Sequence, residues 1–316
     1  MEFTKYVLAL LGIIALQRLY NSIDGDQEKM DDYKLVSDFL INGDLAKKTK
    51  PFLWIHLQYD VNARCWPSFF SRNTTLLNQP YHYITIKSIM DKCGEDFNIC
   101  LIDDRTFNAL IPGWTIDMSQ VGDPLKSKIR ELALAKILYH YGGCLIPGSL
   151  KCFKNFIDVY HIQTKNDTMF VGEFVNHAVS ADKHNLAANT RLMGCLKHNY
   201  KMNEYITFLS NLISTDYTDE SVFVGDESDW CQAQINKNEL NVIHAELLGA
   251  IDTERKIITI DRLMERTYID LPPCILGVYI PEKDILKRTN YQWFARLSAE
   301  QAMTGNSMLH KLLLIQ

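Results

Sequence analysis

KSKIRELALAKILYHYGGCLIPGSL, residues 126–150, is the stretch that decides the fold. Residues 126–141 contain neither glycine nor proline and predict a helix. The pair Gly142 and Gly143 ends that helix, because glycine adopts the left-handed cap conformation without steric cost. The next residues form a very short apolar strand, and Pro147 with Gly148 predicts a turn directly after it.

Arg130 is unusual within this predicted helix. On a 3.6-residue repeat it shares a face with Leu134, Ile137 and Tyr141, which are apolar or aromatic. An arginine on such a face either extends its charged end to water or finds an acidic partner. The sequence leaves both outcomes open.

The composition indicates one large domain with appendages and excludes one class of function. The chain has 316 residues, of which 47% are hydrophobic, so it can bury a full core. Its net charge of −5 argues against a nucleic-acid binder, whose surface would be basic. The cysteines show no C-x-x-C pair and no zinc-site spacing, so we interpret them as reduced structural residues.

The N-terminus carries an unbroken apolar run at residues 6–16. We interpret residues 1–20 as an uncleaved signal-anchor, with a hydrophobic helix packed in a protein assembly as the alternative. Residues 21–50 are polar and of mixed charge, and we interpret them as a stem. This organisation predicts a membrane-associated protein rather than a soluble cytoplasmic one.

The body predicts an α/β fold with an open mixed sheet flanked by helices. Residues 52–57, 97–102 and 169–174 are dense apolar runs typical of buried strands, and residues 78–90 and 202–213 have helical spacing. Asp103 and Asp104 follow the second strand, at the sheet edge where such folds bind ligands. They could contact a ligand, pair with Arg130 or cap the helix that begins at Arg105.

The stretch at residues 126–150, called the organising stretch below, resembles the central motif of family 32 glycosyltransferases, sugar-nucleotide enzymes with a DXD motif. Arg130, Leu138, Tyr139 and the two glycines fall into register with the family pattern D-x-x-R, L-Y-x-x-G-G. His56 at the end of the first strand, the acidic pair and the segment at residues 189–199 follow in family order.

The resemblance implies a GT-A-like fold at residues 51–280 with a C-terminal helical extension at 281–316. For His56 we favour a satisfied strand-end histidine over a catalytic one. The nucleotide-sugar-binding candidates that the resemblance implies are His56, Asp103, Asp104, Ser127, Arg130, Gly142, Gly143, Ser149 and Asn189.

The three acids of the family motif are replaced by Ser127, Pro147 and Ser149. In the family design such carboxylates hold Mg²⁺ or Mn²⁺ against the diphosphate. We therefore expect no cofactor, and a metal only if another carboxylate site exists.

Three functional interpretations remain. The first is a degenerate, non-catalytic binding or structural module of a membrane or virion, since the wording also resembles transferase-like proteins of large DNA viruses. The second is an active glycosyltransferase that uses arginine or lysine instead of a metal. The third is an unrelated α/β protein. The expected partners are a nucleotide sugar, a membrane through residues 6–16 and a protein assembly such as a virion, but no nucleic acid.

Overall fold

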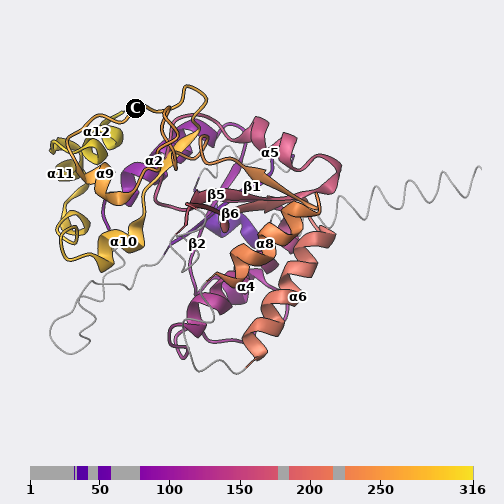
Figure 1. Ribbon diagram of the computed structural model, residues 1–316. Helices are drawn as coiled ribbons and strands as arrows, with labels where there is room; N and C mark the ends of the chain where they lie inside the picture. Colours follow the sequence, from indigo (N-terminus) through magenta and orange to yellow (C-terminus); the bar gives the residue numbers. More distant parts are fainter. Residues whose placement is uncertain are drawn as a thin grey trace, which may run out of the picture.

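The computed structural model describes residues 32, 34–41, 49–57, 79–176, 185–215 and 225–315 (Figure 1). A six-stranded sheet with the order β2-β1-β3-β6-β5-β7 forms its centre. The strands are β1 (Phe52–His56), β2 (Asn98–Ile102), β3 (Gly143–Leu145), β5 (Met169–Val175), β6 (Leu186–Cys195) and β7 (Leu240–Ile243). Strand β6 is antiparallel to both of its neighbours, whereas β1 is parallel to β2 and β3, and β5 is parallel to β7. The sheet is therefore mixed.

Helices cover both faces of this sheet. Figure 1 shows α4 (Leu125–Tyr141), α6 (Tyr200–Ser214) and α8 (Asp226–Asn236) together on one side. Helices α2 (His82–Cys93) and α5 (Ile157–Gln163) contribute to the core on the other side. Alternate residues of β1 separate the two cores, since Trp54 packs in the first while Leu53 and Ile55 pack in the second.

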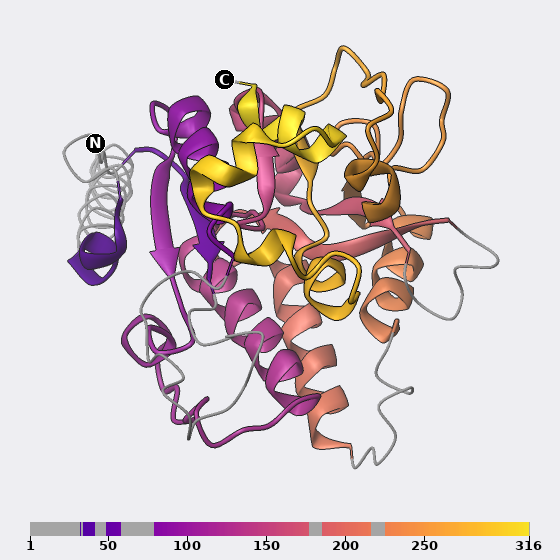
Figure 2. The same ribbon diagram turned by 90° about the vertical axis from the view of Figure 1, so that its left-hand side faces the viewer.

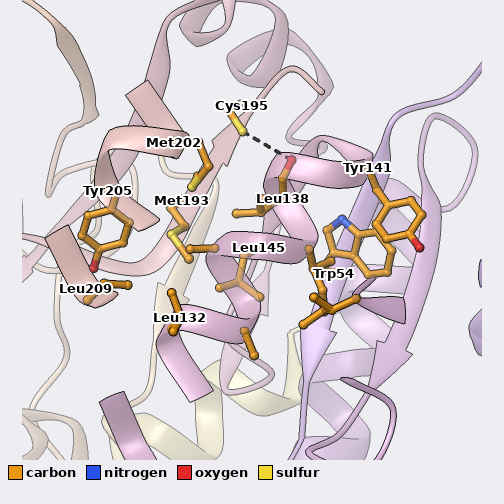
Figure 3. Packing of buried hydrophobic residues seen from close by; sticks show 14 of the residues in the cluster. Trp54, Leu132, Leu138, Tyr141, Leu145, Met193, Cys195, Met202, Tyr205 and Leu209 are labelled. Carbon is orange, nitrogen blue, oxygen red and sulfur yellow. Dashed lines mark hydrogen bonds between the residues drawn. The ribbon is translucent and has the colours of Figure 1, made fainter. Parts of the chain in front are cut away.

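The core beneath α4 and α6 is closely packed with apolar and aromatic side chains. Figure 3 shows Leu132 and Leu138 of α4 between Trp54 of β1 and Met202 of α6, all of them at most 7% exposed. The buried thiol of Cys195 donates a hydrogen bond to the Leu138 carbonyl oxygen at 3.6 Å. This packing joins the organising helix to the sheet and to the helix beside it.

At the double glycine the chain leaves α4 and enters strand β3 of the sheet. The N–H of Gly142 donates to the Leu138 carbonyl oxygen at 2.8 Å, and its φ is +71°. Gly143 has a φ of +100°, and a Cβ there would lie 2.2 Å from the Phe52 carbonyl oxygen. Both positions need glycine, for backbone conformation and for the close approach of β1.

The C-terminal helices form a third core beside the sheet. A two-stranded sheet pairs β4 (Leu150–Cys152) with β8 (Gly277–Tyr279). Figure 2 shows the short C-terminal helices in yellow. The short helices of the described chain are η1 (Ser37–Phe39), α3 (Phe107–Leu110), η3 (Lys165–Asp167), α9 (Ile260–Met264), α10 (Glu282–Lys287), η5 (Phe294–Arg296), α11 (Ala299–Thr304) and α12 (Met308–Leu314). Apolar residues of α9 to α12 share one buried cluster with Tyr81 and Val278.

The observed architecture confirms the predicted α/β class with an open mixed sheet flanked by helices. The predicted signal-anchor at residues 1–20 and most of the predicted stem at 21–50 lie outside the described residues. Within the described ranges no helix is long and apolar enough to cross a membrane. The domain limits at residues 51 and 280 stay predictions. The cysteines that the structure describes are all free thiols, as the sequence predicted.

Candidate functional site

A cavity of about 460 Å³ opens at the carboxyl ends of β1, β3 and β5. Its walls come from the first turns of α4 and α8, the first half of β6, and the segment from Tyr279 through α10. Open α/β sheets bind ligands at this edge, because loops and helix starts converge there. The cavity is large enough for a small molecule.

Asp104 contacts both Arg130 and His56, two residues that line the cavity. Its two carboxylate oxygens accept hydrogen bonds from Arg130 Nε and Nη2, each at 2.7 Å. Its Oδ1 also lies 2.9 Å from His56 Nε2, and the His56 ring stacks on Phe107. Burial disfavours the charge of Asp104, but the bonds from Arg130 and His56 outweigh it and hold the pKa of Asp104 well below its usual range.

This arrangement answers two questions that the sequence left open. Arg130 has an acidic partner, so its place on an apolar helix face is balanced by a bidentate ion pair. Asp103 holds the turn at residues 104–106, since its Oδ1 accepts from the backbone N–H groups of Arg105 and Thr106 at 2.9 and 3.0 Å. The predicted helix cap at Arg105 is wrong, because α3 begins at Phe107 with Thr106 as its N-cap and has no side-chain cap. The acidic pair is therefore divided between two structural roles.

A second network is centred on Glu131, which follows Arg130 on α4. Glu131 Oε1 accepts short hydrogen bonds from the hydroxyls of Thr190 and Tyr205. One turn earlier on α4, the ammonium group of Lys128 pairs with Glu227 at the start of α8. Both carboxylates thus have fixed partners.

A bulge in β6 directs Arg191 into the cavity. The pairing of β5 with β6 jumps from Val171 opposite Met193 to Gly172 opposite Asn189. The residues in between leave the regular ladder, as bulges beside binding sites often do. Asn189 Oδ1 accepts from the backbone N–H of Arg191 at 2.9 Å, which holds the Asn189 side chain against the bulge, and both residues line the cavity.

The Arg191 guanidinium contacts a phenol rather than a carboxylate. Its Nη1 donates to Tyr279 Oη at 2.9 Å, and its Cζ lies 5.5 Å from the centre of the Tyr279 ring. Burial raises the pKa of Tyr279 to about 12, although the nearby arginine opposes that rise. The phenol therefore keeps its proton at neutral pH and can donate it to a ligand.

Helix α10 completes the cavity with groups of both signs. Glu282 Oε2 lies 3.2 Å from His82 Nε2 of α2. Lys283 and Lys287 line the cavity on the same helix, and both are exposed. In the described parts of the chain, Arg191, Lys283 and Lys287 form no salt bridge. The cavity wall therefore carries three cations without a salt-bridge partner in the described chain, although the carboxylates of Glu282 and Asp284 act on Arg191 through space and help to raise its pKa.

The sequence-derived candidates divide between the cavity and the fold around it. His56, Ser127, Arg130 and Asn189 line the cavity, and Asp104 holds two of them. The others, Asp103, Gly142, Gly143 and Ser149, are not among its lining residues. The glycines cap α4, and Ser149 is fully buried.

Position 147, where the family motif has an acid, lies on the cavity wall as proline. Among the described residues, no group of three or more His, Cys, Asp and Glu side chains could hold a metal ion. The expectation that no cofactor is needed stays a prediction, because a ligand's own phosphates could complete a metal site.

Sequence reasoning did not identify Arg191, Tyr279, Lys283 or Lys287. Arg191 lies in the segment at residues 189–199 that the sequence analysis associated with the site through Asn189, so it could have been predicted as a site residue. The other three lie in later segments whose sequence carries no signal that they return to the carboxyl edge of β1. A scan against models of protein families and a search of curated proteins find no match to this chain.

Proposed function

We propose that the protein binds a small anionic molecule of the nucleotide-sugar class in this cavity, on a GT-A-like scaffold without a DXD-bound metal. The observation that carries the proposal is the presence on the cavity wall of three cations that have no salt-bridge partner in the described chain. Arg191, Lys283 and Lys287 form no salt bridge within the described chain. Guanidinium and ammonium groups bind phosphate oxygens through charge-assisted hydrogen bonds.

The position of the cavity also supports this proposal. It lies at the carboxyl edge of a mixed sheet, beside the first turns of the helix α4 that carries part of the resemblance. Aromatic side chains do not fill it, so a ligand has room to enter. A cleft closed by tyrosine and tryptophan would instead have favoured a purely structural role.

Binding without turnover is the form of the proposal that the chemistry favours. Pro147 offers no oxygen ligand, and Ser127 Oγ already donates to the Pro124 carbonyl oxygen at 2.7 Å. Asp104 is engaged with Arg130 and His56. An active, metal-independent glycosyltransferase is the second candidate, because the same cations could stabilise a departing diphosphate.

Isothermal titration of the full chain with UDP- and GDP-sugars, with and without Mn²⁺, tests the proposal. We expect micromolar binding that does not require Mn²⁺. Arg191→Met should weaken it roughly tenfold, since a charged hydrogen bond contributes about 1.5 kcal/mol or more. Lys311→Met is the matched control, because Lys311 is an exposed lysine of α12 outside the cavity.

Two results would contradict the proposal. One is the failure of the folded wild-type chain to bind any of these nucleotides. The other is equal binding by wild type and Arg191→Met. Steady release of free sugar or transfer to an acceptor would instead establish the transferase.

A further inference from the structure

An acceptor triplet for N-linked glycans lies in the turn between α5 and β5. Asn166, Asp167 and Thr168 have the pattern Asn-x-Thr without proline in the middle, which is the pattern that receives such glycans. The same pattern recurs at residues 73–75, which lie outside the described residues. A folded protein can carry a glycan only where its chain presents the asparagine on the surface, because the sugar is bulky and hydrophilic. The surroundings of Asn166 therefore decide whether this turn can be modified.

Asn166 is presented on the surface of the molecule. Its side chain is exposed and forms no hydrogen bond or ion pair within the described chain. Its backbone φ of +61° and ψ of +30° lie in the left-handed region, which asparagine tolerates better than most residues. The side-chain amide is therefore available, and a glycan attached to it would displace no contact of the fold.

The other two residues of the triplet hold the turn in place. The Thr168 hydroxyl donates to the Lys165 carbonyl oxygen at 3.0 Å. The backbone carbonyl and the side chain of Asp167 accept hydrogen bonds from the Asn199 side-chain amide, and Asn199 also caps α6. The fold therefore fixes the turn through these neighbours and leaves Asn166 on its exposed side.

The turn lies at the end of the sheet opposite the cavity. It leads directly into Met169, the first residue of β5, whereas Val175 and Asn176 at the other end of that strand line the cavity. A strand of seven residues spans about 20 Å. A glycan on Asn166 would consequently leave the cavity open, so the inference is independent of the ligand proposed for that cavity.

We propose that Asn166 carries an N-linked glycan, and hence that the globular body folds on the non-cytoplasmic side of a membrane. The donor class is a lipid-linked oligosaccharyl diphosphate of a eukaryotic secretory membrane. The side-chain amide nitrogen of Asn166 forms a bond to the anomeric carbon of the first sugar and loses one proton. The bond between that carbon and the diphosphate oxygen breaks, and the diphosphate leaves with the electron pair, so no oxidant or reductant is needed. The apolar run at residues 6–16, interpreted from the sequence as a signal-anchor, is the segment that would deliver the body to that compartment.

Expression of the full chain in cultured eukaryotic cells tests the proposal. The purified chain is treated with a peptide N-glycosidase in heavy-oxygen water, which leaves a labelled aspartate wherever a glycan was attached, and its peptides are mapped by mass spectrometry. We expect the label at residue 166 and a faster-migrating band on gels after the treatment. Peptide mapping separates this site from the triplet at residues 73–75.

Thr168→Val and Thr168→Ser form a matched pair of variants. Thr168→Val removes the hydroxyl that the acceptor pattern requires and should lose the glycan, whereas Thr168→Ser keeps the hydroxyl and should retain it. Asn166→Gln removes an exposed side chain without contacts and should also lose the glycan. A wild-type chain without a glycan at residue 166, or a glycan there that persists in Thr168→Val, overturns the proposal. Failure to bind nucleotide sugars would refute only the proposed function.

Discussion

Removing the carboxylate of Asp104 should destabilise the protein, because this carboxylate holds both Arg130 and His56. In Asp104→Asn the Arg130 guanidinium loses both of its 2.7 Å bonds to a charged group. The two side chains are 14% and 21% exposed, so the pair is partly buried. Breaking a fully buried pair costs about 3–5 kcal/mol and a surface pair at most about 1. Discounted for this exposure, the expected loss is roughly 2–3 kcal/mol.

Urea denaturation at pH 7 measures this loss, and a thermal scan should show a fall in Tm of about 3–5 °C. Asp103→Asn is the matched control. Asp103 is the adjacent carboxylate but only holds the turn before α3, and the asparagine side-chain oxygen can accept the same backbone hydrogen bonds. We therefore expect the control to stay within about 0.5 kcal/mol of wild type.

The pH dependence gives an independent check. The pKa of Asp104 is lower in the folded chain than in the unfolded chain, so its contribution is complete above an unfolded pKa of about 3.9. The stability difference between wild type and Asp104→Asn should shrink as the pH falls below that value. A double-mutant cycle with Arg130→Met should show a coupling of about 1.5 kcal/mol or more. Additive effects, or a loss as small as that of Asp103→Asn, would refute the reasoning.

Other expected outcomes concern the backbone, the buried network and the thiols. Gly143→Ala should cost about 2–4 kcal/mol in urea denaturation or prevent folding, because a Cβ there meets the β1 backbone, whereas Gly122→Ala has open space and should be nearly neutral. Tyr205→Phe removes the hydroxyl that donates to the half-buried carboxylate of Glu131 and should lower the unfolding free energy by about 1–2 kcal/mol. A loss no larger than that of a Tyr→Phe substitution at an exposed tyrosine would contradict this expectation. In thiol labelling followed by peptide mapping, the exposed Cys274 should react quickly, while Cys144, whose pKa burial raises, should react only after unfolding; equal rates would contradict the described burial.

Much of the fold could be predicted because its signals are local. The helix of α4, its stop at Gly142 and Gly143, and the apolar runs of β1, β2 and β5 are each visible within a few residues. Strand β6 was not predicted as a strand. It carries Asn189 and Arg191 among its apolar residues, and its bulge interrupts the alternation that identifies strands.

The site was predictable only where its parts lie near the organising stretch. The pairing of Arg130 with an acid follows from its apolar helix face, so it was one of the stated alternatives. Lys283 could not be placed, because nothing local indicates that α10 returns to the carboxyl edge of β1. Long-range packing of the C-terminal helices against Tyr81 and Val278 determines that return, and it leaves no periodic signature.

The burial of Ser149 limits any attempt to introduce a metal-binding carboxylate at residues 147–149. Its side chain is fully enclosed, and its carbonyl oxygen accepts from the Ile280 N–H at 3.1 Å. A carboxylate introduced there would lose its hydration without gaining a counterion, so it would take up a proton rather than bind a cation. Pro147, two residues earlier, lies on the cavity wall and could be replaced by an acid that remains hydrated. Residue 147 is therefore a position on the cavity surface that tolerates a charged side chain, whereas residue 149 belongs to the packed interior.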